Sequence, residues 1–214
     1  MKQISDLFDN MDMWRHLPAY QLERRADIFF SIYLPDLLSR KFGGQVEYVI
    51  PEFPIRIGTI HTKSDINQSF KVDYLVKAKA ANKVFLVELK TDDASRRNKQ
   101  DWYLERATQV GLVKLLEGVR EIYKATNSKR KYRHLLRALQ ETGFIALEDR
   151  DAFHIVQADY DLEISYIQPN NREGKSNIIS FQEASQIILQ HGDELSVRFS
   201  DSLLRWAAVQ AGEE

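Results

Sequence analysis

The sequence predicts an α/β fold in which a mixed central sheet is flanked by helices. Two apolar runs, residues 72–76 and 84–89, are rich in valine, leucine and phenylalanine and have the length of strands. Helical spacing of apolar residues precedes and follows them, and the order of elements is neither a regular βαβ repeat nor all-β. With 214 residues, of which 43% are hydrophobic, the chain is expected to form one domain, residues 1–214, with residues 178–214 as a helical C-terminal extension.

The first predicted helix begins near Pro18. Leu22, Ala26, Phe30 and Leu34 recur at spacings that place them on one face. Pro35 is expected to kink or divide this helix, and the pair Gly43-Gly44 to end it. Glu23 lies on the border of the apolar face, so its side chain is expected to approach the sheet.

Three strands are expected next. Residues 45–57 form the first, which Pro51 and Pro54 restrict to a bent or edge position because proline cannot donate a ladder hydrogen bond. Residues 58–67 are polar and predict a loop. Residues 70–77 and 83–90 are separated by a short polar break, so they are expected to pair as a hairpin.

The second half of the chain alternates helices and strands. Helices are expected from Ser95, a suitable N-cap, to Tyr123, and over residues 129–140. Strands are expected over residues 143–147 and 162–167. Ser180 with Glu183 forms a capping-box pattern that predicts a C-terminal helix, and further helix is expected around Trp206.

Composition and motifs exclude several kinds of site. The chain has no cysteine, so it contains neither disulfides nor thiolate metal sites. Its five histidines are scattered, which argues against zinc, and residues 58–64 lack a glycine that a phosphate-binding loop requires. Neither a signal peptide nor a membrane span is evident, so a cytoplasmic protein without membrane contact is expected.

A charged cluster is predicted at the end of the second hairpin strand. Side chains alternate along a strand, so Glu88 and Lys90 leave the same face, roughly 7 Å apart at the backbone. Asp73 lies on the partner strand and can converge on the same place. Two carboxylates and a lysine at the end of an apolar strand suit a hard divalent cation and an attacked phosphodiester. The alternative is a surface ion pair on an edge strand, which stabilises little.

In this context Asp73, Glu88 and Lys90 resemble the motif of the PD-(D/E)XK, or restriction-endonuclease-like, nuclease superfamily. The resemblance spans roughly residues 20–167 and implies an αβββαβ core. Val72 stands where the family motif often has proline. Glu23 fits the position at which many members of the family place a further acidic residue.

The resemblance implies the chemistry of the site. Asp73, Glu88, the carbonyl of Leu89 and Glu23 would bind Mg²⁺ or Mn²⁺, and Lys90 would orient the attacking water or stabilise charge on phosphorus. The expected activity is metal-dependent hydrolysis of phosphodiester bonds in nucleic acid, with DNA favoured over RNA; endonuclease and exonuclease action, and formation of a homodimer, are left open. Because lysine is not a metal ligand, Lys90→Ala is expected to abolish cleavage and to leave stability nearly unchanged.

Two basic groups could bind the phosphates of nucleic acid. The formal net charge of the chain is −1, which argues against bulk electrostatic coating of nucleic acid, but the basic residues are clustered. The first group follows the motif strand and the second lies in a predicted helix: Arg96, Arg97, Lys99, Gln100; Lys129, Arg130, Lys131, Arg133. A solvated helix face is the alternative for both groups.

Two other functions remain open. The same fold could be a catalytically silent module that binds nucleic acid or protein without cutting. The apolar C-terminal helix around Trp206 could instead dock onto a partner in an assembly. Binding of a divalent metal at Asp73 and Glu88 distinguishes the enzyme from both.

Overall fold

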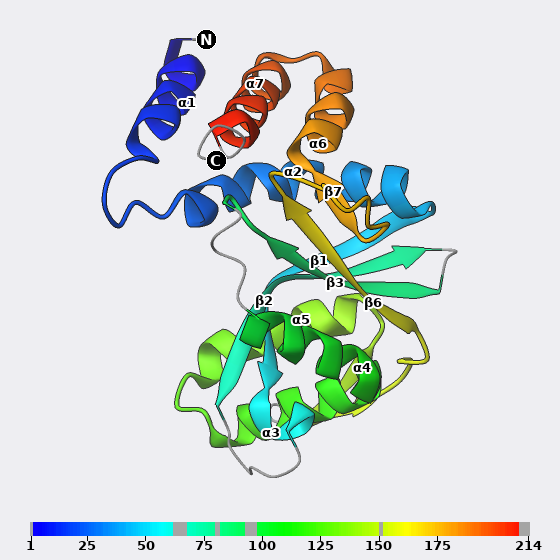
Figure 1. Cartoon of the computed structure of the whole chain (residues 1–214). Helices are drawn as coiled ribbons and strands as arrows, with labels where there is room; N and C mark the ends of the chain where they lie inside the picture. Colours follow the sequence, from blue (N-terminus) through cyan, green and yellow to red (C-terminus); the bar gives the residue numbers. More distant parts are fainter. Residues whose placement is uncertain (1, 62–67, 80–81, 93–97, 150–151, 210–214) are drawn as a thin grey trace. The chain divides into compact units, whose positions relative to one another are not determined.

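The computed structural model describes residues 2–61, 68–79, 82–92, 98–149 and 152–209 (Figure 1). Over these residues the fold is α/β, as predicted, with a five-stranded mixed sheet in the order β1-β2-β3-β6-β7 and a two-stranded sheet β4-β5. The elements are α1 (Lys2–Trp14), α2 (Leu22–Phe42), β1 (Gln45–Arg56), α3 (Ile57–Ile60), β2 (Ser69–Lys79), β3 (Lys83–Leu89), α4 (Asn98–Ala125), α5 (Lys129–Glu141), β4 (Ile145–Asp149), β5 (Ala152–Ile155), β6 (Asp161–Gln168), β7 (Ile178–Ser180), α6 (Phe181–Ile188), η2 (Leu189–His191) and α7 (Glu194–Val209).

The chain divides into two compact units. Unit 1 comprises Met1–Gly44, Glu88–Arg97 and Ser165–Glu214, and unit 2 comprises Gln45–Val87 and Asn98–Ile164. Strands β3 and β6 therefore contribute residues to both units.

In unit 2 the predicted hairpin is confirmed. Strand β2 pairs antiparallel with β3, with Tyr74 opposite Val87 and Val76 opposite Phe85. Strand β1 pairs antiparallel with β2 and lies at the edge of the sheet, as its prolines predicted. The side chains of β3 are buried from Val84 onward, which explains why this strand is a nearly continuous apolar run.

The helices of unit 2 differ in part from the prediction. Helix α5 was predicted almost to the residue, whereas Ser95, the expected N-cap of α4, lies outside the described residues. Gly111 breaks α4 with φ +78°, a conformation that favours glycine. At Gly118, α4 comes so close to α3 that a Cβ atom would lie 2.6 Å from Oγ1 of Thr59. The strand predicted near residue 145 pairs with β5, which was not predicted.

Unit 1 is built around α2. This helix continues through Pro35 instead of ending there. Proline removes one backbone hydrogen bond, at a cost of about 3 kcal/mol, but the buried Leu34, Leu37 and Leu38 surround it and hold the helix against its neighbours. Helix α6 begins as predicted, with the hydroxyl of Ser180 accepting a hydrogen bond from the backbone of Glu183.

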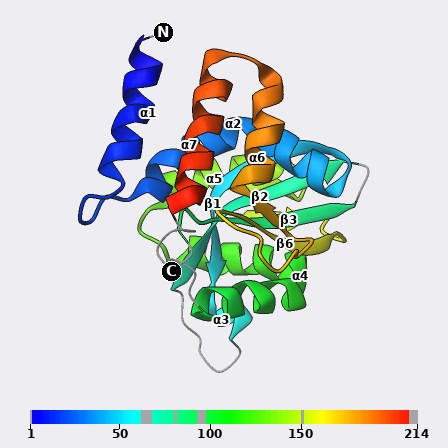
Figure 2. The ribbon, with the colours of Figure 1, turned by 45° about the horizontal axis from the view of Figure 1, so that its top comes forward.

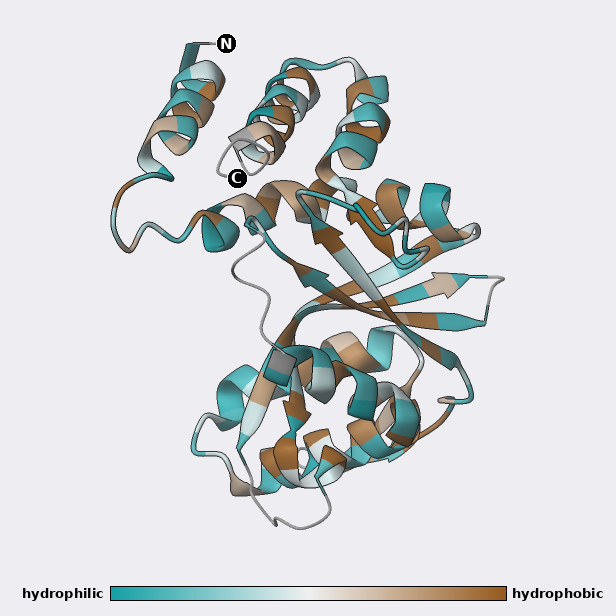
Figure 3. Ribbon diagram, in the orientation of Figure 1, coloured by the Kyte–Doolittle hydropathy of each residue, from teal (hydrophilic) through white to brown (hydrophobic). Residues whose placement is uncertain are grey.

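Helix α1 was not predicted. It lies beside α7, and α6 packs against the opposite side of α7 (Figures 1 and 2). In Figure 3 both α1 and α7 alternate hydrophobic and hydrophilic residues around the helix. Phe8 and Met11 are the buried residues of α1, and Phe8 contacts the ring of Phe199 at a centroid distance of 5.7 Å. An apolar face this narrow gives little periodic signal in the sequence.

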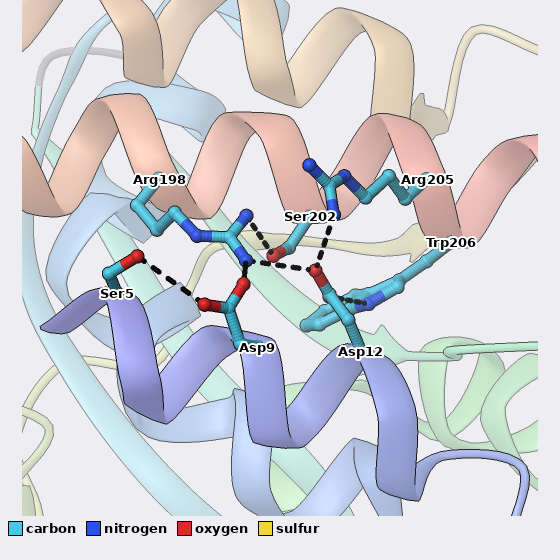
Figure 4. A network of polar contacts seen from close by, with 7 residues as sticks. All are labelled: Ser5, Asp9, Asp12, Arg198, Ser202, Arg205 and Trp206. Carbon is cyan, nitrogen blue, oxygen red and sulfur yellow. Dashed lines mark hydrogen bonds and ion pairs between the residues drawn. The ribbon is translucent and has the colours of Figure 1, made fainter.

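Polar contacts complete the attachment of α1 (Figure 4). Asp12 accepts hydrogen bonds from Nε1 of the buried Trp206 at 2.8 Å and from Arg198 at 3.1 Å, and Arg205 lies 3.5 Å away. Asp9 also accepts from Arg198 but is 58% exposed, against 13% for Asp12. Trp206 itself is buried within its own unit, so its ring packs inside the protein; docking of the C-terminal helix onto a partner stays a prediction.

We expect Asp12→Ala to lower the free energy of unfolding by about 2–4 kcal/mol, because it leaves Arg198 and the buried Trp206 without this largely shielded acceptor. Asp9→Ala is the matched control and should cost about 0–1 kcal/mol, since its ion pair is exposed to solvent. Urea denaturation of the two variants measures both values. A negligible loss in both variants would mean that α1 is held by its apolar contacts alone.

Candidate functional site

The charged residues predicted at the end of β3 form a buried ion pair in unit 1. Nζ of Lys90 donates to Oε1 of Glu88 at 2.7 Å. The side chains of Glu88 and Lys90 are 2% and 6% exposed. Burial of two charges is costly unless they are paired, so this contact compensates part of that cost. The expectation that Glu88 and Lys90 share a face is confirmed.

The position of β3 excludes the surface interpretation of this pair. Strand β3 is the third of five strands, between β2 and β6. The backbone amide of Lys90 donates to the carbonyl of Ile167 at 2.9 Å, so the chain is still paired after the last residue of β3. A charged pair on an edge strand would be solvated, whereas this one is not.

Glu23 reaches the same lysine from the first turn of α2. Its Oε2 lies 3.7 Å from Nζ of Lys90, and its side chain is 32% exposed. Lys90 is thus shared by a buried and a partly exposed carboxylate. The prediction that Glu23 points from the first helix toward the motif strand is confirmed.

Asp73 belongs to unit 2. It is half-buried on β2, immediately before Tyr74, and Tyr74 is paired with Val87, the residue that precedes Glu88. Leu89, whose carbonyl was a predicted metal ligand, is buried at the end of β3. Convergence of Asp73 with Glu88 stays a prediction.

Two cavities in unit 1 lie beside these residues: Lys90 lines the first, Glu23 lines the second, and Asp92 lines both. One, of about 190 Å³, is lined by Lys90, by Gln168 at the end of β6 and by residues of the segment that joins β6 to β7, among them Arg172. The other, of about 430 Å³, is lined by Glu23, Thr91 and the side chains of Arg15 and Arg24. The buried pair is therefore next to space that a ligand can enter.

Neither Thr91 nor Asp92 was among the predicted site residues. Asp92 continues the alternation of Glu88 and Lys90, so its spacing could have indicated it. The segment between β6 and β7 could not have been identified in this way, because more than seventy residues separate it from Lys90 in the sequence.

The carboxylates of the site are oxygen ligands, but in the part of the chain that the structure describes too few acidic side chains are grouped there to complete a metal site. Among the described residues, no three or more histidine, aspartate and glutamate side chains are grouped so that they could hold a metal ion. In unit 1 two carboxylates, Glu23 and Glu88, contact Lys90. A Mg²⁺ site of the predicted composition needs a further carboxylate.

The residues that were predicted to contact nucleic acid differ in how exposed they are. Arg96 and Arg97 lie outside the described residues. Lys99 is exposed and Gln100 half-buried in the first turn of α4. In α5, Arg130, Lys131 and Arg133 are exposed.

Lys129 contacts the end of α4. Its Nζ donates to the carbonyls of Tyr123 and Lys124 at the C-terminal end of α4, and it lies 4.5 Å from the centroid of the Tyr123 ring. A cation there interacts favourably with the helix dipole and with the unpaired carbonyls. Lys129 is therefore engaged by α4, whereas its neighbours on α5 face solvent.

Comparison with known proteins found no matching family model, no matching curated protein and no matching solved structure. Within the described ranges, none of the helices has both the length and the apolar character that crossing a bilayer requires.

Proposed function

We propose that this chain hydrolyses phosphodiester bonds of nucleic acid with the help of a divalent metal, and that DNA is favoured over RNA. The observation that carries the proposal is the buried Glu88–Lys90 pair in a central strand, with Glu23 against the same lysine and cavities beside it. Apolar residues of similar volume would often be at least as stable in that place. A buried charged pair bordering a cavity is therefore better explained by function than by stability.

Glu88, Glu23, the carbonyl of Leu89 and Asp73 are the groups that would hold Mg²⁺ or Mn²⁺. All are oxygen donors, which these cations prefer. The register that pairs Tyr74 with Val87 supports the inclusion of Asp73, since Asp73 and Glu88 are the next residues along their strands. A bound cation would polarise the phosphoryl oxygen and lower the pKa of a bound water.

Lys90 would act on the substrate rather than on the metal. Its ammonium is held by Glu88 and Glu23 and lines the smaller cavity. A phosphate entering that cavity would meet a fixed positive charge, which stabilises the negative charge that develops on the phosphoryl oxygens. The carboxylates keep the ammonium oriented, so little reorganisation is needed during the reaction.

The exposed Arg130, Lys131 and Arg133 of α5 would bind phosphates of the same nucleic acid outside the site. Double-strand cleavage by a chain with one such site would favour a homodimer, with one site for each strand.

A second candidate is a catalytically silent module on the same fold that binds nucleic acid or protein. The specific observation in its favour is that, among the residues described, no three acidic or histidine side chains are grouped for a metal. The two candidates differ in whether a divalent cation binds to the folded protein.

We expect Mn²⁺ to raise the thermal midpoint of the wild type. At a free concentration of about 100 times Kd the added stability is about 2.7 kcal/mol, which for a chain of this length corresponds to about 5–10 °C. Asp73→Asn should reduce the shift, because it removes a negative ligand. Glu163→Gln is the control and should leave it unchanged, since Glu163 pairs with Lys83 instead, at 2.7 Å.

Two outcomes of this titration would count against the assignment. A full shift in Asp73→Asn would remove Asp73 from the metal ligands. No shift in the wild type would favour the silent module.

A further inference from the structure

A row of aromatic side chains lies at the surface of unit 2, where α4 begins. The rings of His61 and Trp102, Trp102 and Tyr103, and Tyr103 and Phe70 have centroid distances of 5.9, 5.4 and 5.0 Å. His61 follows α3, Phe70 belongs to β2, and Trp102 and Tyr103 lie in the first turns of α4 (Figure 1). We call these four residues the aromatic row.

One end of the aromatic row has a clear structural role. Phe70 and Tyr103 are half-buried and stacked at an interplanar angle of 25°, so they anchor α4 to β2. Such a pair stabilises the folded protein through the apolar area it buries and through the favourable arrangement of its two rings.

Trp102 is not accounted for by this packing. Its side chain is 41% exposed, and its contacts with His61 and Tyr103 are tilted by 59° and 55° rather than stacked. Tryptophan is among the residues most enriched at the centres of binding surfaces, so an exposed tryptophan beside other rings is a candidate contact for a ligand.

A positive charge accompanies the rings. Nζ of Lys99, an exposed residue, lies 5.6 Å from the centroid of Tyr103. Asp101 and Glu105 lie on the same turns of α4, so the local net charge is small. Of the residues that the structure describes at this surface, the aromatic rings and the ammonium of Lys99 are the groups that a ligand could contact.

We propose that the aromatic row binds single-stranded nucleic acid, with an unpaired base stacked on Trp102 and a phosphate bound by Lys99. Stacking on Trp102 needs the face of an unpaired base, and the paired bases inside a duplex do not expose theirs. Because every type of base has such a face, the contact is independent of sequence. This inference rests on the proposed function, since it takes nucleic acid as the ligand, and it adds the strand form that the protein recognises. Stacking on Trp102 and the charge of Lys99 are separate contributions to the affinity, so they can be measured separately.

The test is equilibrium binding of a fluorescein-labelled dT oligonucleotide in EDTA, followed by fluorescence anisotropy. Trp102→Ala should weaken binding about 5- to 160-fold, the range given by removal of one stacked base contact. Trp102→Phe should recover most of the affinity, because it keeps a planar ring. Trp14→Ala is the control: Trp14 is equally exposed at 43%, but lies on α1.

The contribution of Lys99 is measured by salt dependence. Lys99→Ala should reduce the slope of log K against log salt concentration by about 0.7, the value for one phosphate of a single strand. Lys114→Ala is the control, since Lys114 is also exposed on α4 but pairs with Glu117 at 2.7 Å.

Three results would overturn the inference. The first is that the wild type does not bind the oligonucleotide, and the second is that Trp102→Ala binds it as tightly as the wild type does. The third is that the wild type binds a duplex of the same length more tightly than the single strand. Each is distinct from failure of the proposed function, because binding is measured without metal, whereas that function depends on the response to Mn²⁺.

Discussion

Lys90→Ala is expected to abolish phosphodiester cleavage and also to destabilise the protein. Loss of a fixed charge that stabilises the transition state costs about 10²–10³-fold in rate. Removal of the lysine also leaves the Glu88 carboxylate, 2% exposed, without its 2.7 Å contact. Breaking a buried ion pair at one partner costs about 3–5 kcal/mol. The sequence-based expectation that stability would be nearly unchanged is therefore revised, because the sequence did not reveal how deeply the pair is buried.

Lys41 provides the matched control for this change. It is a lysine of unit 1, 17% exposed, whose Nζ lies 3.0 Å from Glu183. We expect Lys41→Ala to lose stability but to retain cleavage when assayed at a temperature where it is folded. If Lys90→Ala cleaves at the wild-type rate under the same conditions, Lys90 has only a structural role.

Glu88→Gln is expected to remove both metal binding and cleavage while keeping the volume of the side chain. The amide oxygen can still accept the hydrogen bond from Lys90, so the loss of stability should be smaller than in Lys90→Ala. The negative charge that would bind the cation is absent, so the Mn²⁺ shift in thermal midpoint should disappear and the rate should fall by about 10³-fold or more.

Glu183→Gln is the corresponding control, because it makes the same change in the Lys41 pair. It should keep both the Mn²⁺ shift and cleavage. A Glu88→Gln protein that still responds to Mn²⁺ like the wild type would show that Glu88 is not a ligand.

The parts of the fold that follow from local patterns were predictable. The hairpin of β2 and β3 is encoded by two apolar runs and a polar break, and the pairing follows from their proximity in the sequence. The start of α6 is encoded by Ser180 and Glu183, three residues apart. The shared face of Glu88 and Lys90 is likewise a property of one strand.

The parts that depend on distant residues were not predictable. Helix α1 is held by Asp9 and Asp12, whose partners Arg198 and Trp206 lie at the other end of the chain. The short apolar face of α1 gives no sustained pattern without them. The role of Lys129 depends in the same way on carbonyls at the end of another helix, α4.

The site shows the same division. Its charged residues lie on one strand and in the first turn of one helix, so local sequence patterns predict them. Its cavities depend on how α2, the end of β3 and the β6–β7 segment pack in unit 1. That packing brings Asp92 to both cavities and leaves Lys90 only 6% exposed. Neither property can be read from the alternation of side chains along a strand.

The most direct test of the proposed function is cleavage of end-labelled linear DNA, single- and double-stranded, by the wild type and by Glu88→Gln in Mn²⁺ and in EDTA. RNA of the same sequence serves as the comparison substrate. We predict cleavage by the wild type in Mn²⁺, faster on DNA than on RNA, and none in EDTA or by Glu88→Gln. A folded wild-type protein that cuts no substrate in Mn²⁺ or Mg²⁺, or a Glu88→Gln variant that cuts as fast as the wild type, would contradict the proposed function.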